Sequence, residues 1–149
     1  MNKSLLVIFI CLLSQFSYSE DIKPTVLDVY KTGKDGKSKA LLGGLVNMDA
    51  IYTEAGSNCT QMIGMIKVGG IQFSESGATL ESFRFVDAKN NQWSVPTNIK
   101  NLSSVDRSRA NNFIRQGKSY FAHVQVCGSG GFASLISLYD PKVTFGAFD

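Results

Sequence analysis

Few side chains in this sequence are of a type that does chemistry, and the most informative are the cysteines and the single histidine. Cys59 and Cys127 lie far apart in the chain, and Cys11 stands inside an apolar run near the N-terminus. His123 precedes Cys127 by four residues, with no ligand-spacing motif around it. A structural zinc site needs four ligands and an activated nucleophile needs a base, so neither a metal centre nor a catalytic dyad is favoured.

The sequence contains none of the common catalytic or nucleotide-binding motifs. There is no GxSxG, no HExxH, no P-loop and no dinucleotide fingerprint. The glycine-rich segment at residues 128–131 has no following Lys-Ser or Lys-Thr and leads into an expected strand, which favours a hairpin turn over a phosphate cradle. We therefore expect a protein that is not an enzyme and has no cofactor and no metal.

Aromatic side chains are the other candidates for function. A ligand-stacking face could be formed by these side chains together with the histidine, and the candidate binding residues are Trp93, Tyr120, Phe121, His123 and Tyr139. The alternative is that the aromatic rings belong to the hydrophobic core, and the sequence leaves both open.

The N-terminus has the order of regions that is typical of a signal peptide. Lys3 supplies the positive charge, residues 5–13 are unbroken apolar sequence, and Ser17 and Ser19 are small residues before the expected cleavage site. The alternative, a membrane anchor, would need about 20 apolar residues. We expect residues 1–19 to be removed and residues 20–149 to form a single β-rich domain in the periplasm or the medium, without membrane insertion.

An exported chain with two remaining cysteines most simply forms one disulfide, between Cys59 and Cys127. Such a bond closes a loop of about 69 residues, which is worth about 4 kcal/mol in the chain-entropy model. A metal-binding pair and free thiols are the alternatives.

The charge of the chain excludes some partners. The formal net charge is +3, and it falls to +2 when Lys3 leaves with the signal peptide. So small an excess does not predict nucleic-acid binding. A lysine cluster interleaved with glycine and aspartate predicts a solvated loop, with an anionic surface as the alternative; its members are Lys31, Lys34, Lys37 and Lys39.

The element that organises the expected fold is the stretch from residue 103 to residue 140. Ser103 can cap a helix whose first turn contains Asp106, and Gly117 has the freedom to end it. Residues 119–127 then alternate, with Tyr120, Ala122, Val124 and Val126 on one face. After the turn at 128–131, a second strand runs to Asp140-Pro141.

The rest of the chain predicts further strands interrupted by glycine pairs. Residues 40–52 contain Gly43-Gly44, where a strand can bulge, although a helix over 45–52 is a weaker option. Residues 61–73 predict a long strand interrupted at Gly69-Gly70, and two more strands are expected over 80–87 and 92–95. A brief strand is expected near residues 26–30, and an edge strand over 142–148.

These elements predict a fold that is mainly β with one short helix, curled into a small OB-like barrel. The curled strands followed by residues 106–140 resemble the layout of small exported bacterial OB-fold proteins, and distantly that of the B subunits of pertussis-like toxins. In that group a helix ending in glycine precedes a strand, and a disulfide ties strands together. The resemblance covers residues 40–140 and implies an exported OB-like binding domain, with a homo-oligomer as one possibility.

Two functions follow from these observations. The first is an exported bacterial binding module without catalytic activity that contacts a protein or a glycan. The second is a periplasmic inhibitor or immunity protein that blocks a hydrolase by filling its cleft.

Overall fold

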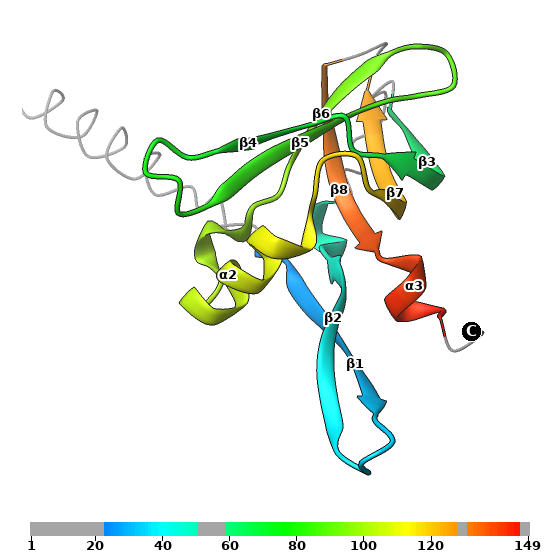
Figure 1. The fold of residues 1–149 in the computed structure, drawn as a ribbon. Coiled ribbons are helices and arrows are strands. Elements are labelled where there is room, and N and C mark those ends of the chain that lie inside the picture. Colours follow the sequence, from blue (N-terminus) through cyan, green and yellow to red (C-terminus); the bar gives the residue numbers. More distant parts are fainter. Residues whose placement is uncertain (1–22, 51–58, 128–130, 147–149) are drawn as a thin grey trace, which may run out of the picture.

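A computed structural model describes residues 23–50, 59–127 and 131–146 of the chain. The predicted signal peptide lies outside the described residues, as does most of the glycine-rich turn. Eight strands and four short helical segments are described (Figure 1): β1 (Thr25–Thr32), β2 (Ser38–Val46), η1 (Met48–Ala50), β3 (Cys59–Lys67), β4 (Gly70–Phe73), β5 (Leu80–Val86), β6 (Gln92–Pro96), η2 (Ile99–Asn101), α2 (Ser104–Phe113), β7 (Ser119–Cys127), β8 (Gly131–Tyr139) and α3 (Pro141–Thr144).

Strand β8 is the centre of the sheet. It pairs with β7 along one edge and, at its C-terminal end, with β2 on the other. Its first residues pair in parallel with β6, which continues through β5 to β4. The fold is mainly β with one short helix, as predicted. The sheet curls without closing into a complete barrel, which is consistent with the small OB-like fold that the sequence predicted.

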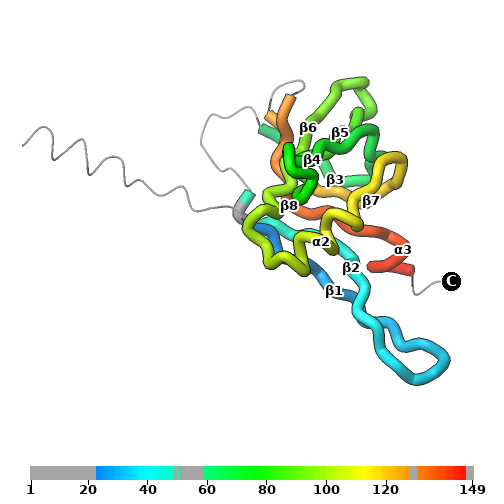
Figure 2. Tube along the Cα trace, turned by 60° about the vertical axis from the view of Figure 1, so that its left-hand side comes forward, coloured from blue at the N-terminus to red at the C-terminus, as the bar shows by residue number. Residues whose placement is uncertain are grey.

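The glycine pair in β2 is a bulge, as predicted. The pairing of β1 with β2 shifts between Leu27 and Asp28, which leaves Gly43 without a partner in the register. Gly44 is held close to β8, where an added Cβ would lie 2.6 Å from Cδ1 of Tyr139 and 2.7 Å from the carbonyl oxygen of Leu138. The bend therefore lets β2 leave β8 and continue as the projecting β1–β2 hairpin (Figures 1 and 2).

The second glycine pair divides the predicted strand 61–73 into β3 and β4. These two strands have different partners, β7 and β5. The N–H of Gly69 donates a hydrogen bond of 2.8 Å to the carbonyl oxygen of Arg84, so the corner between β3 and β4 is attached to β5.

The helix α2 begins as predicted but ends earlier. The Ser103 hydroxyl accepts a hydrogen bond of 3.1 Å from the Asp106 N–H, and Ala110 and Phe113 are buried. Ile114 already has extended backbone angles, so the helix stops at Phe113. Gly117 does have a positive φ of 81°, but it serves the turn into β7.

The C-terminal segment differs from the predicted edge strand. Pro141 begins the short helix α3, and the Asp140 carboxylate accepts a hydrogen bond of 3.0 Å from the Lys142 N–H. Proline at the first helical position and aspartate at the cap together favour a helical turn over a strand. Residues 147–149 lie outside the described residues.

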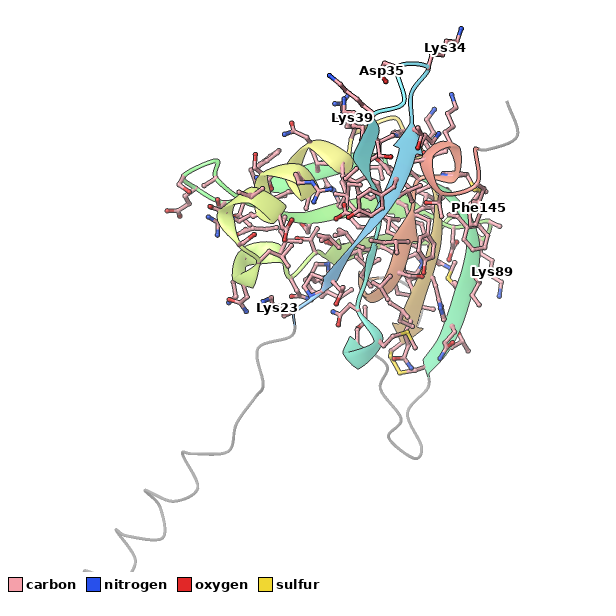
Figure 3. All side chains as sticks on the ribbon, turned by 90° about the horizontal axis from the view of Figure 1, so that it is seen from below. Lys23, Lys34, Asp35, Lys39, Lys89 and Phe145 are labelled. Carbon is pink, nitrogen blue, oxygen red and sulfur yellow. A yellow bond between two sulfur atoms is a disulfide. The ribbon has the colours of Figure 1, made fainter. Side chains whose placement is uncertain are left out.

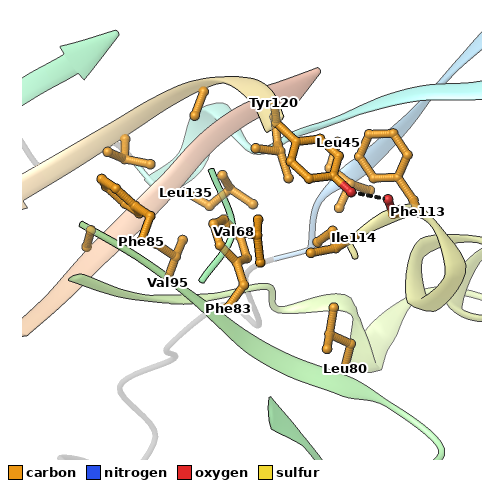
Figure 4. Packing of buried hydrophobic residues seen from close by; sticks show 14 of the residues in the cluster. Leu45, Val68, Leu80, Phe83, Phe85, Val95, Phe113, Ile114, Tyr120 and Leu135 are labelled. Carbon is orange, nitrogen blue, oxygen red and sulfur yellow. Dashed lines mark hydrogen bonds between the residues drawn. The ribbon is translucent and has the colours of Figure 1, made fainter. Parts of the chain in front are cut away.

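The core lies inside the curl of the sheet, with α2 at one end (Figure 4). Its largest side chains include Trp93, Tyr120, Phe83 and Phe85. In β8 the core residues are odd-numbered up to Leu135, and the next one is the even-numbered Leu138. The change occurs because the pairing with β7 shifts by one residue between His123 and Val124. Buried and exposed residues of β8 therefore alternate regularly only up to the bulge.

Candidate binding surface

The predicted disulfide is present between Cys59 and Cys127. The two residues are direct cross-strand partners at the start of β3 and the end of β7, and their Cα atoms lie 4.1 Å apart. The predicted pairing of the two cysteines is thereby confirmed, and the bond joins residues that lie 68 positions apart in the chain.

Two of the predicted binding residues belong to the core, which corrects their assignment. Trp93 is 1% exposed and Tyr120 is 0% exposed. The Tyr120 hydroxyl donates a hydrogen bond of 2.5 Å to the Phe113 carbonyl oxygen and accepts one of 2.8 Å from the Arg115 N–H. Burial raises the pKa of Tyr120 to about 12. Neither ring has a face that a ligand can reach.

Trp93 directs its indole N–H toward Asp87, in the turn between β5 and β6. Nε1 of Trp93 lies 2.9 Å from Oδ2 of Asp87, and the Asn91 and Lys89 backbone N–H groups donate to Oδ1 at 2.8 and 2.9 Å. These bonds, that from Trp93 foremost, lower the pKa of Asp87 to about 2.

We expect this turn to give the protein an acid-sensitive contribution to stability. Because the folded-state pKa of Asp87 lies below its ordinary value of about 3.9, the contribution is present above about pH 4 and is lost as the pH falls toward 2. Chemical denaturation of the parent and of Asp87→Asn should show a stability difference at pH 7 that shrinks near pH 2. A difference that stayed constant across this range would contradict the role of the carboxylate charge.

The other three predicted residues lie together on the outer face of the β3–β7–β8 sheet. Phe121 and His123 alternate outward along β7, and Tyr139 pairs with Phe121 from β8. Phe145, which follows α3, packs edge-on against both aromatic rings with ring centroids 6.5 Å away. His123 Nε2 lies 2.7 Å from Oε1 of Gln61 on β3. The structure therefore unites three of the five candidates.

Two exposed residues on the same face were missed by the sequence analysis. Ile63 is 63% exposed and Met65 is 57% exposed, and they pair with His123 and Phe121 across β3 and β7. A signal existed in the sequence, because Met62, Ile63, Met65 and Ile66 place apolar side chains on both faces of one strand. We call Ile63, Met65, Phe121, His123, Tyr139 and Phe145 the outer face.

A cleft runs beside the outer face, between β3 and the end of β5. Its volume is about 190 Å³, and its lining includes Met62, Ile66, Phe85 and Val86. Val86 is 54% exposed, so apolar side chains flank the cleft on both strands. A neighbouring hollow of about 260 Å³ shares Met62 and continues toward the turn after β5. We call the space between β3 and β5 the seam.

Two other clefts have a different chemical character. One of about 410 Å³ is lined largely by hydroxyl and other polar groups near Thr79 and Thr97. Another, of about 440 Å³, lies between α2, β2 and α3 and contains Arg109 and Lys118. These cations form ion pairs with Asp28 and Asp140, the second at 2.5 Å. A third cation in the lining, Arg115, donates a hydrogen bond of 3.0 Å from Nε to the Asn112 carbonyl oxygen.

The described residues contain no group of three or more His, Cys, Asp or Glu side chains that could hold a metal ion. Within the same residues, no helix is long and apolar enough to cross a membrane. Searches against protein-family models, curated proteins and solved structures found no match for this chain.

Proposed function

We propose that this protein is an exported, non-catalytic binding module, and that it contacts a protein partner through the outer face beside the seam. The observation that carries the proposal is the exposure of Ile63, Met65 and Val86 around one end of the sheet. Exposed apolar side chains that cluster are typical of interaction sites, because burying them against a partner is favourable.

The chemistry of the outer face favours a protein over a glycan. Its most exposed members are the aliphatic side chains Ile63 and Met65, which complement apolar protein surfaces. The Phe121 and Tyr139 rings, which would stack on sugars, are half-buried, and both pack against Phe145. A glycan site would also need hydrogen-bonding groups around the rings, and His123 is already paired with Gln61.

Export is supported by two observations that do not depend on the outer face. The order of the first 19 residues is that of a signal peptide, and the Cys59–Cys127 disulfide fits an oxidising compartment such as the periplasm or the medium. The resemblance to small exported OB-fold proteins, which is a prediction from the sequence, implies a binding role.

The inhibitor or immunity function remains a second candidate because of the β1–β2 hairpin. The hairpin projects from the body of the molecule (Figure 2), with Lys34, Asp35 and Lys39 near its exposed tip (Figure 3). Tyr30 on this hairpin is 73% exposed. A projecting hairpin of this kind can enter the cleft of a hydrolase.

We expect Ile63→Lys combined with Met65→Lys to weaken binding of a copurifying protein partner by at least tenfold, because contacts at the centre of an interface supply most of the affinity. Partner retention by the tagged mature protein in periplasmic or medium extracts would measure this. Val105→Lys is the matched control, since Val105 is exposed and belongs to α2. This helix lies away from β3 and β7 (Figure 1).

Equal loss of the partner with the Val105→Lys control would contradict the proposed surface, as would full retention with the double variant. The two candidate functions can be separated in the same assay. Replacing residues 33–37 by Asn-Gly shortens the hairpin. If that change alone released the partner, the inhibitor function would replace ours.

A further inference from the structure

The backbone of β3 pairs with β7 along one edge, and no described strand pairs with its other edge. Toward β7, the register joins residues whose numbers sum to 186, such as Met62 with Val124 and Gly64 with Ala122. The Cys59–Cys127 pair, with Cα atoms 4.1 Å apart, has the short spacing of a non-hydrogen-bonded pair. Even-numbered residues therefore form the hydrogen-bonded ladder to β7, and the N–H of Val68 continues it to the Lys118 carbonyl oxygen at 3.0 Å.

The odd-numbered residues of β3 direct their backbone groups to the opposite edge. Gly69 confirms this parity, because its N–H bonds to Arg84 of β5 instead of β7. In the described part of the chain, β3 pairs with no strand other than β7. Among the described residues, the N–H and C=O groups of Gln61, Ile63 and Met65 therefore form a row of donors and acceptors along the seam that no strand pairs with.

Ile63 and Met65 also carry the exposed side chains of the outer face, so the free edge is both apolar and unpaired. Natural proteins normally protect such an edge with charge, proline or a covering segment. Here β3 has nine residues, no proline, and a single charged residue, Lys67, at its end. The edge has the properties of a template for another strand.

We infer that the partner contributes an extended polypeptide segment that adds to the sheet as a strand along Gln61–Ile63–Met65 of β3. Alternate apolar side chains of that segment would enter the seam above Met62 and Phe85. This inference rests on the proposed function and specifies how the partner is held. The main chain gives affinity and the seam selects apolar residues.

The chemistry of the edge identifies a polypeptide as the occupant. Donors and acceptors that recur every second residue, about 6.8 Å apart, match the main chain of a strand. A single segment also suits the space better than the sheet edge of a second folded copy. The cleft is bounded by β3 on one side and by Phe85 and Val86 of β5 on the other, so the entering strand has no room for a neighbouring strand of its own.

Linear twelve-residue peptides selected from a random displayed library on the mature, oxidised protein provide the probe. Each selected peptide is resynthesised in two versions, one with N-methyl groups on its odd-numbered backbone nitrogens and one with N-methyl groups on its even-numbered backbone nitrogens. N-methylation leaves the side chains unchanged but blocks hydrogen bonds. We expect one N-methylated version to bind with a Kd about tenfold higher or more, and the other version to bind almost as well as the parent peptide, because only one edge of the peptide faces β3.

A second arm of the experiment changes the protein. Ile63→Pro removes a donor from the free edge while the ladder to β7, which uses even-numbered residues, keeps all its bonds. Ile63→Val keeps both the donor and a β-branched side chain and is the matched control. We expect peptide binding to fall about tenfold with proline and to change less than about threefold with valine.

Amide hydrogen exchange distinguishes strand addition from a general stabilisation of the protein, because only strand addition slows exchange at alternate residues of β3. Saturating peptide should slow exchange at Gln61, Ile63 and Met65 and leave Met62 and Gly64 unchanged, since those two are already paired with β7.

The outcomes separate this inference from the proposed function. Suppose that the selected peptides do not bind the Ile63→Lys, Met65→Lys protein, but that N-methylation leaves their Kd unchanged. The outer face would then still be the binding surface, and strand addition would be overturned. Peptides indifferent to both changes would overturn both proposals. Absence of any enriched peptide that is sensitive to N-methylation would also overturn strand addition. A sedimenting dimer that Ile63→Pro disperses would assign the edge to a second copy of the chain and overturn the partner segment.

Discussion

Replacing Cys59 and Cys127 together by serine is expected to lower the free energy of unfolding by about 4 kcal/mol under oxidising conditions. The disulfide links segments 68 residues apart, so its loss restores much conformational freedom to the unfolded chain. It also joins the first residue of β3 to β7, the one strand with which β3 pairs in the described part of the chain. A loss of this size is a large part of the 5–15 kcal/mol by which domains are usually stable.

Denaturant titration of the parent and of the Cys59→Ser, Cys127→Ser variant, with and without a strong reductant, measures this effect. The two curves should nearly coincide in reductant, because the parent then loses the same constraint. Thiol labelling of the unfolded, unreduced mature parent should find no reactive thiol. Two labelled thiols, or a difference in stability that persisted in reductant, would contradict the role assigned to the bond.

Trp93→Ala is the second change for which we expect a large effect, a destabilisation of about 4 kcal/mol. Trp93 is fully buried between β5 and β8, so removing its ring leaves a cavity in the core. The substitution also removes the indole N–H that Asp87 accepts at 2.9 Å. Both losses concern stability, and the outer face should keep its partner as long as the protein remains folded.

Trp93→Phe is the matched control, because it retains an aromatic ring in the core and loses the donor to Asp87. It should be destabilised less than Trp93→Ala, and its stability should respond less to pH between 4 and 2 than that of the parent. Thermal unfolding followed by circular dichroism measures the first expectation. If Trp93→Ala left the melting temperature unchanged while partner binding disappeared, Trp93 would be a ligand-contacting residue after all.

Local sequence signals predicted much of the fold because their physical causes act over a few residues. Ser103 caps α2 through a hydroxyl three residues from its partner, and the bulge in β2 is signalled by a glycine pair at one site. The alternation in 119–127 separated Tyr120 and Val124, which face the core, from Phe121 and His123, which do not. The predicted edge strand over 142–148 was wrong, because Asp140-Pro141 favours the start of a helical turn as well as the end of a strand.

The candidate site depended on long-range contacts that no local pattern contains. Trp93 and Phe121 are equally suited to a core or to a binding face, and the register of whole strands placed Trp93 inside and Phe121 outside. Ile63 was not selected from the sequence because an apolar residue in a strand is ordinarily buried. Its exposure arises because the register with β7 places Ile63 beside His123 on the outer face of the sheet, whereas Met62 and Gly64 face the other way.

The sequence by itself determined the strands, the capped helix and the pair of cysteines available for a disulfide, because periodicity, capping and composition are properties of short segments. Tertiary structure alone decided that Cys59 faces Cys127, that β3 pairs with β7 alone within residues 23–50, 59–127 and 131–146, and that the seam lies beside exposed apolar side chains. The physical reason is that a sheet which curls without closing must leave an edge somewhere. Which strand becomes that edge is fixed by the packing of segments far apart in the chain.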